Sequence, residues 1–299
     1  MKVICVGHST YDITLPVDEY PTENIKYRLD KHIDCGGGPA ANGAYLMAKW
    51  GMDVSIASVL GNDFYADLII KEYENIGCDT SLLEKHDDHY TTSSYIVANR
   101  SNGSRTILSS KDKPIDKLNK SLNIDCDVVL IDGEHPDSAE ELLKHNGKDI
   151  ISVLDAGRLN DNTRRLGKLV KYLICAKDFA EAFSNTTLSA DDIEGLTKCH
   201  KELVEYFNTN VIITLEARGS FTFIDGNYEV IPSIKVKALD STGAGDIFHG
   251  AFTYFISNGY SLRDSIKYSS ITSAISVTRI GARFSIPELE EVLEYDNLI

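Results

Sequence analysis

The sequence lacks several features that would each point to a class of protein. The N-terminal stretch is apolar only as far as His8, which is too short for a signal-peptide core or a membrane span. The cysteines show no paired short spacings, so neither a zinc site nor a dense disulfide framework is indicated. The six are Cys5, Cys35, Cys78, Cys126, Cys175 and Cys199. We therefore expect a cytoplasmic protein with reduced, mostly buried cysteines.

The chain is also short of positive charge. Lys and Arg number 30 against 45 Asp and Glu, which leaves a formal net charge of -15. This sign argues against nucleic acid and against an anionic membrane as partners, because both are negatively charged. A phosphate ligand would need a local source of positive potential, which helix N-termini, a few placed Arg or Lys side chains or a divalent metal could supply.

Three common active-site motifs are missing. A GxxxxGK[ST] loop does not occur, which excludes a P-loop enzyme, and no GxGxxG follows the first strand, which argues against a nicotinamide cofactor. A GxSxG elbow, as in serine hydrolases, is absent as well. No repeat or linker interrupts the sequence, so we expect one large domain over residues 1–299.

Strands and helices alternate along much of the chain. Short apolar runs separated by helix-length segments predict an α/β fold with a mostly parallel sheet and helices on both faces. The predicted strands are 2–7, 54–60, 128–131, 150–154, 172–175 and 211–215, and the predicted helices are 39–50, 64–76, 138–145, 162–170, 193–207, 245–257, 262–278 and 286–295. Segments 221–224 and 228–231 flank Asp225 and Gly226, a pair typical of a hairpin turn.

Two regions stand outside this alternation. Residues 13–17 and 27–33 alternate weakly between polar and apolar, and 91–99 with 105–109 predict a second hairpin. We expect the segments 11–34 and 91–109 to pair as a small β-sheet at the mouth of the main sheet, where it would serve as a lid.

The stretch DSTGAGDIFHGAF, residues 240–252, concentrates the most chemistry. Gly243 and Gly245 leave the backbone bare where an apolar helix begins, and the free N–H groups and dipole of a helix N-terminus form an anion site. A carboxylate at Asp246 would repel an anion unless it serves as a general base for phosphoryl transfer. A helix cap by Asp246 is the alternative interpretation.

This stretch and GGGPAANGAYLMAKWG, residues 36–51, resemble the two signature regions of the ribokinase-like (PfkB) carbohydrate kinases. The similarity extends over essentially the whole chain in length and element order. It implies a ribokinase-like fold and ATP-dependent phosphorylation of a sugar hydroxyl, with Mg²⁺. By this resemblance Asp246 is the catalytic base, and the backbone N–H groups of Gly243, Ala244 and Gly245 form the anion hole.

The resemblance also implies sugar contacts. Asp12 and Asn42 match residues that bind sugar hydroxyls, and Gly37 and Gly38 resemble the hinge or close-approach glycines beside them. Lys26 falls where sulfofructose kinases have a lysine near the anionic end of the substrate. A solvated lysine in the lid is the other interpretation of Lys26.

Further matches concern the phosphates and the nucleotide. Asp155 and Arg158 resemble a pattern in which the arginine lies near the phosphates. Thr214 and Gly219 resemble the nucleotide-binding strand and loop, although Glu216 stands where the family usually has glycine.

The metal positions follow the family only in part. Asp240 and Thr242, with carbonyls near Gly281, resemble a monovalent-cation site, which implies K⁺. Many members link Mg²⁺ to an NxxE motif, but the matching stretch here is CAKDFAEAF. It offers either Ala176 with Phe179 or, in a shifted alignment, Asp178 with Glu181.

The substrate is expected to be a ketose. Residues 21–42 and the FHGA after the proposed base resemble fructokinase, ketohexokinase and sulfofructose kinase, and Glu134 stands where an arginine would bind a sulfonate, which favours a neutral sugar. His249 fits a packed core histidine or a substrate contact. A nucleoside kinase and an inactive sugar- or nucleotide-binding protein are the alternatives. An uncovered lid face leads us to expect a homodimer through the lid.

Overall fold

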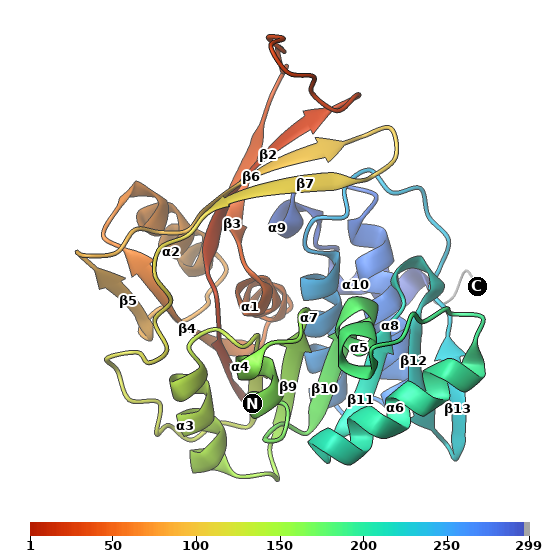
Figure 1. Ribbon diagram of the computed structural model, residues 1–299. Helices are drawn as coiled ribbons and strands as arrows, with labels where there is room; N and C mark the ends of the chain where they lie inside the picture. The colour runs from red at the N-terminus through yellow and green to blue at the C-terminus, as the bar shows by residue number, and fades with distance from the viewer. Residues whose placement is uncertain (296–299) are drawn as a thin grey trace.

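The larger of two sheets organises the molecule. Figure 1 shows the computed structural model, which describes residues 1–295. The sheet has the strand order β13-β12-β11-β10-β9-β8-β1-β4-β5. It contains β1 (Lys2–Val6), β4 (Asp53–Gly61), β5 (Leu83–His86), β8 (Val128–Ile131), β9 (Ile151–Ala156), β10 (Tyr172–Ala176), β11 (Asn210–Thr214), β12 (Ser220–Ile224) and β13 (Asn227–Ile231). All pairs from β11 to β5 are parallel, and β12 and β13 form an antiparallel edge, which confirms the mostly parallel sheet.

Helices cover both faces because each strand sends alternate side chains into two cores. On β1, Val3 and Cys5 pack into one core, while Ile4 and Val6 pack into the other. The first core is covered by α1 (Pro39–Lys49), α2 (Phe64–Asn75), α7 (Ala244–Ser257), α8 (Leu262–Ser276) and α10 (Leu289–Tyr295). The second is covered by α3 (Pro136–Asn146), α4 (Asp161–Leu166), α5 (Lys177–Ser184) and α6 (Ile193–Phe207).

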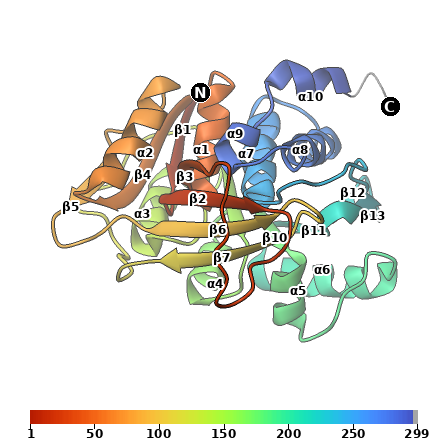
Figure 2. The ribbon, with the colours of Figure 1, turned by 90° about the horizontal axis from the view of Figure 1, so that it is seen from above.

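A second, small sheet stands above the larger one in Figure 1, and Figure 2 shows it from above. Its order is β3-β2-β6-β7, built from β3 (Ile33–Gly37), β2 (Thr10–Val17), β6 (Ser93–Asn99) and β7 (Arg105–Ser110). Both predicted extension segments contribute strands to it. The weak alternation over 27–33 was misleading, because residues 18–32 form no strand and only Ile33 enters β3. That run is rich in charged residues, and its large apolar side chains, such as Ile25 and Leu29, stay exposed because no core lies beside them.

Several elements escaped the sequence patterns. β5, α5, the short α9 (Ala282–Ser285) and a 3₁₀ turn at Glu216–Arg218 were not predicted. They are too short for periodicity to show. α4 ends at Leu166 rather than 170, and a side chain at Gly167 would collide with Leu173 and Phe207. The hairpin turn is confirmed, since Asp225 and Gly226 both have positive φ.

The crossing of α1 and α7 sets the geometry of the candidate site. A Cβ on Gly250 of α7 would lie 2.7 Å from Cα of Gly43 on α1, and a Cβ on Gly43 would lie 2.4 Å from Leu130. Only glycines allow the two backbones to approach this closely. The contact lies one residue from Asn42 and one helical turn from Asp246.

The cysteine expectation is also confirmed. All six thiols are free, and five of them are buried, with Cys126 partly exposed. Over residues 1–295, no helix combines the length and the apolar character that crossing a membrane requires.

Candidate active site

The start of α7 is open to a ligand. Gly243 is the N-cap with φ 73°, in the left-handed region that glycine adopts easily, and Ile247 N–H bonds to its carbonyl at 2.8 Å. Gly245 is exposed, and a Cβ built there would meet no atom within 4 Å. The first N–H groups of a helix have no partner within it, so this turn presents donors to open space, and of these Ala244 N also makes a long hydrogen bond of 3.4 Å to the Ser241 carbonyl oxygen. Asp246 is not the helix cap, because no side chain caps this end.

Asp246 is held by Asn42. Asn42 Nδ2 donates to Asp246 Oδ2 at 2.8 Å, across 204 residues of sequence. On the other side of the amide, Arg283 Nε lies 3.4 Å from Asn42 Oδ1. A guanidinium can only donate, so the amide must turn its oxygen to Arg283 and its NH₂ to Asp246. The carboxylate thereby receives a hydrogen bond of fixed direction.

Arg283 was missed by the sequence reasoning. The side chain is 2% exposed and bonds Glu72 and the Tyr73 hydroxyl, each at 2.7 Å, and its guanidinium stacks 4.4 Å from the Tyr73 ring centre. Burial acts to lower the pKa of Arg283, but the charges of Tyr73 and Glu72 outweigh it and raise that pKa. Glu72 also accepts from Gly36 N, so the pair joins α2, β3 and α9. No local motif marks such a residue.

The predicted sugar contacts gather beside this network. Asp12 lies on β2, 8% exposed, with Thr10 Oγ1 donating to it at 2.7 Å. Burial raises the pKa of Asp12, and the neighbouring Asp246 adds to this. A Cβ on Gly37 would lie 2.0 Å from the Asp12 carboxylate, and one on Gly38 would lie 2.1 Å from a backbone oxygen, so both positions require glycine. Asp12, Asn42 and Asp246 are therefore brought together.

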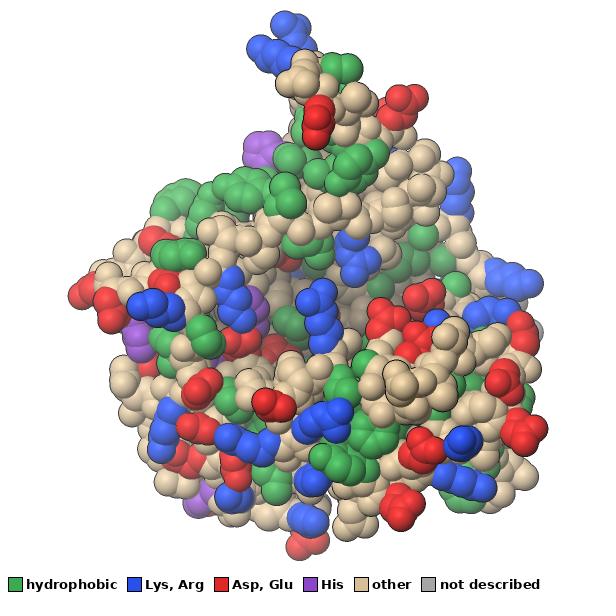
Figure 3. Space-filling view, in the orientation of Figure 1, with side chains coloured by type: hydrophobic (Ala, Val, Ile, Leu, Met, Phe, Trp, Pro, Cys, Tyr) green, Lys and Arg blue, Asp and Glu red, His purple; other side chains and the backbone are tan. Residues whose placement is uncertain are grey.

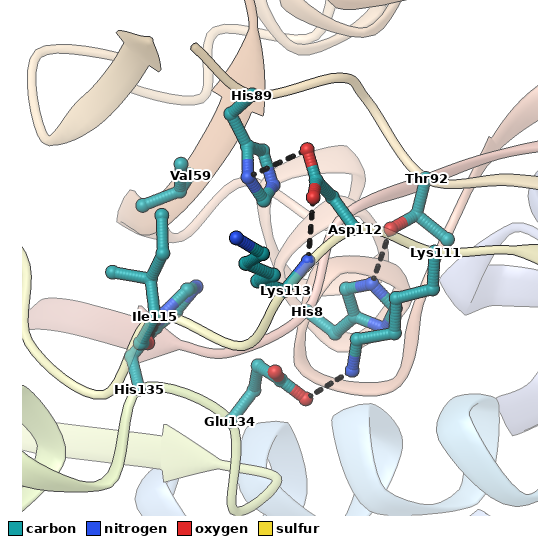
Figure 4. Close-up of a pocket in the computed structure, with 10 residues that line it drawn as sticks. All are labelled: His8, Val59, His89, Thr92, Lys111, Asp112, Lys113, Ile115, Glu134 and His135. Atoms are coloured by element: carbon teal, nitrogen blue, oxygen red, sulfur yellow. Dashed lines mark hydrogen bonds and ion pairs between the residues drawn. The ribbon is translucent and has the colours of Figure 1, made fainter.

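A polar pocket lies beyond the ends of β1 and β8, lined by His8, Glu134 and His135 among others (Figure 4). The Asp132 carboxylate accepts from the backbone N–H groups of His8, Ala40 and Glu134 at 2.9 to 3.0 Å, which ties β1, α1 and β8 together. Burial raises the pKa of Asp132 to about 7, although these N–H groups act to lower it. Glu134 pairs with Lys111 Nζ at 2.8 Å, and both line the pocket.

The predicted nucleotide residues lie at the end of β11. Thr214 Oγ1 donates to the Cys175 carbonyl at 3.3 Å. Gly219 has φ 104°, and a Cβ there would lie 2.0 Å from the Ile231 carbonyl, so the hairpin itself requires this glycine. Glu216 has φ 53°, a left-handed conformation that costs a residue with a side chain more than it costs glycine.

The predicted cation residues form a closed hydrogen-bonded turn. The Asp240 carboxylate accepts from Thr242 N at 2.9 Å, from Thr242 Oγ1 at 2.6 Å and from Gly281 N at 3.0 Å. Because the Asp240 carboxylate is occupied by these bonds, backbone carbonyl oxygens remain as the ligands that a cation could use. Across the described residues, no group of three or more His, Cys, Asp or Glu side chains is arranged to hold a metal.

Five predicted positions stand apart from the cluster. Lys26 and Arg158 are exposed, and neither charged group makes a hydrogen bond or ion pair within the described part of the chain. Of the candidate magnesium residues, Phe179 is fully buried and cannot serve as a ligand. Glu181 is occupied by Leu188 N at 2.7 Å and by Lys177 Nζ at 2.9 Å, whereas the Asp178 side chain is exposed.

Comparison with known proteins decides the family. The model of the pfkB family carbohydrate kinases matches residues 1–289. The chain belongs to this family. It is a phosphotransferase with an alcohol group as acceptor, and it uses ATP with Mg²⁺.

Similar proteins cover the whole chain. The ribokinase of Staphylococcus aureus (strain COL) is 29% identical over 97% of this chain and 98% of its own. The deoxyribokinase of Salmonella typhi is 27% identical over 100% of this chain and 99% of its own. The crystal structure of the Thermotoga maritima ribokinase superposes with a TM-score of 0.80 at 27% identity and covers 99% of each chain.

Arg283→Met tests the network behind Asp246. The change leaves Glu72 with an uncompensated charge, so we expect the free energy of unfolding to fall by about 3 kcal/mol. We also expect kcat to fall at temperatures where the variant is folded, because the Asn42 amide is then free to turn. Chemical denaturation and a coupled ADP assay measure the two effects.

Arg279→Met is the matched control, since Arg279 lies four residues before Arg283 and pairs with Glu291, and both side chains of that pair are partly exposed. We expect this control to change the free energy of unfolding by less than about 1 kcal/mol and to leave kcat unchanged. Equal losses in the two variants would contradict the role given to Arg283.

Proposed function

We propose that this kinase transfers the γ-phosphoryl group of ATP to a hydroxyl of an aldopentose of the ribose or deoxyribose type. One observation carries the proposal: the Asp246 carboxylate, held by Asn42, stands beside the bare N-terminal turn of α7. The N–H groups of the turn can bind the transferred phosphoryl group, and the carboxylate can accept the proton of the sugar hydroxyl that receives it.

Each residue of the site then has a defined task. Asp12 and Asn42 bind sugar hydroxyls, and Asp246 takes the proton as the sugar oxygen attacks phosphorus and the bond to the leaving ADP breaks. N–H groups of Gly243, Ala244 and Gly245 stabilise charge on the phosphoryl oxygens. ATP with Mg²⁺ supplies the phosphoryl group. No covalent enzyme intermediate is needed.

The choice of an aldopentose rests on the relatives. Similar proteins over the full length are named ribokinase and deoxyribokinase, and these names give no support to the ketose expected from the sequence. Two features of the chain agree with an uncharged sugar. Lys26 is exposed in an irregular segment, and the charge of Lys111 is already paired with Glu134.

For the nucleotide we propose the C-terminal end of β11, where Thr214 and Gly219 lie. The exposed guanidinium of Arg158 is free to pair with phosphates, which would offset the negative charge of the chain. Mg²⁺ prefers oxygen ligands and keeps several waters, so one exposed carboxylate such as Asp178 together with phosphate oxygens would suffice. A complete protein cage is not required.

A monovalent cation such as K⁺ is proposed beside the anion hole. The turn from Asp240 to Thr242 packs against Gly281 through hydrogen bonds to the Asp240 carboxylate. A cation held by backbone carbonyls there would stiffen the start of α7.

The small sheet is proposed as a lid on a single domain spanning residues 1–299, of which 296–299 lie outside the described residues. Asp12, Ser94 and Ser109 are in register on one face of the sheet, and Ile13, Tyr95 and Leu108 are in register on the other. Tyr95 is 42% and Leu108 62% exposed, and hydrophobic side chains gather on this part of the surface (Figure 3). A second copy of the chain would cover this strip, which supports a homodimer through the lid.

Asp246→Asn tests the base. The amide preserves the shape but cannot accept a proton, so we expect kcat to fall by about a thousandfold. Affinity for ATP should stay within about twofold, because the base is not part of the nucleotide site. Steady-state kinetics and calorimetric titration measure both quantities. Asp264→Asn, which alters a first-turn acid of α8, is the control and should retain full activity. Substantial turnover by Asp246→Asn would remove Asp246 from the role of base.

A substrate panel tests the sugar. We expect kcat/KM for ribose or deoxyribose to exceed that for fructose and adenosine by at least about tenfold, since a site built for one set of hydroxyls leaves polar groups unpaired with another. Preference for fructose would restore the ketose expectation, and preference for adenosine would favour the nucleoside kinase. If none of the acceptors in the panel supports ADP formation, the substrate lies outside these classes.

A further inference from the structure

The ring of His249 is surrounded by hydrogen-bond acceptors. It lies on α7 one turn after Asp246 and is 4% exposed. Nδ1 is 2.5 Å from the Gly245 carbonyl oxygen and 3.1 Å from Asp155 Oδ2, while Nε2 is 3.2 Å from the Ile174 carbonyl oxygen. Carbonyl oxygens accept and never donate, so both ring nitrogens need a proton. A neutral imidazole carries only one.

Asp155 is placed to neutralise the resulting charge. It is the penultimate residue of β9, a strand that packs against α7, is 6% exposed and accepts a further hydrogen bond from Gly157 N. Burial raises the pKa of Asp155 to about 6, while the charge of His249 acts to lower it and that of Asp246 acts to raise it. Within the described residues, the hydrogen bond that the His249 ring makes to β10 goes to the Ile174 carbonyl. Either ion alone would be costly at this depth.

Two other buried histidines provide a contrast. His200 Nε2 lies 2.9 Å from the Val211 carbonyl, and its Nδ1 has no partner in the described chain. His135 Nδ1 lies 2.6 Å from the Ile115 carbonyl, and its Nε2 is likewise unpartnered there. Burial lowers the pKa of both. One acceptor for one N–H describes a neutral ring, which is the opposite of His249.

We propose that His249 is a doubly protonated imidazolium paired with Asp155, and that this pair positions the anion hole. The Gly245 carbonyl directly follows the Gly245 N–H, the last of the three in the proposed anion hole, so holding this oxygen through His249 restrains the backbone of the turn that carries them. The ring also places a positive charge one turn below the site where phosphoryl charge develops. This second part rests on the proposed function, whereas the protonation state does not.

Nuclear magnetic resonance of the full chain labelled with ¹⁵N-histidine tests the protonation state. At pH 7.5 we expect both ring nitrogens of His249 to carry protons, and those of His135 and His200 to show one protonated and one bare nitrogen. His249→Asn assigns the signals by removing one set. A bare nitrogen in the His249 ring would overturn the proposal, whatever the activity of the enzyme.

Kinetics test the positioning role. We expect His249→Asn to lower kcat about tenfold with KM for ATP and sugar within about twofold, because the ring touches neither substrate. His200→Asn is the matched buried control and should keep kcat. If His249→Asn keeps kcat while the wild-type His249 ring is doubly protonated by NMR, the pair is structural and the positioning role is wrong.

A double-mutant cycle tests the pairing. Asp155→Asn strands a buried cation, so its melting temperature should fall below that of the double variant His249→Asn/Asp155→Asn, in which both charges are gone. A double variant that melts no higher than Asp155→Asn would contradict the ion pair. If Asp246→Asn keeps its activity, only the assignment of Asp246 as the base is wrong. The double-mutant cycle would still test the His249–Asp155 ion pair.

Discussion

The close contact of α1 and α7 at Gly43 and Gly250 is the constraint on which the site depends. Glycines at the crossing remove the side chains that would hold the helices apart, and the approach brings the Asn42 amide within 2.8 Å of the Asp246 carboxylate. The two signature regions of the sequence are therefore the two sides of one contact. The position of Asp246 in residues 240–252 therefore depends on how residues 36–51 pack against α7.

The electrostatics of the site also follow from packing. Because a net charge of -15 repels an anion, a phosphoryl group needs local donors, and we propose that the start of α7 provides them. The α7 N-terminus supplies N–H groups, Arg283 is buried with its charge paired to Glu72, and His249 lies against Asp155. Nearby acids such as Asp12 have raised pKa values because burial disfavours their charge, which is common where side chains await a polar ligand.

Local patterns in the sequence were enough for most strands of the larger sheet, the long helices and the turn before α7. The parallel sheet follows from alternation, and Asp246 beside Gly243 and Gly245 follows from the chemistry of a helix start. Arg283 and the pairing of His249 with Asp155 could not be found this way. Arg283 meets Asn42 across 241 residues, and His249 looks like any core histidine until the acceptors around it are known. Residues 18–32 were misjudged because a weak alternation of polar and apolar residues does not form a strand unless its apolar side can pack against a core.

The most direct measurement compares the kcat of Gly250→Ala and Gly259→Ala. A methyl at Gly250 meets the backbone of Gly43 and forces α1 and α7 apart, whereas one at Gly259, just beyond α7, meets open space and adds only the cost of a positive φ. We expect kcat to fall at least about tenfold in Gly250→Ala, because the proposed base Asp246 loses its fixed partner Asn42, and to be unchanged in Gly259→Ala. Wild-type kcat in a folded Gly250→Ala variant would contradict it.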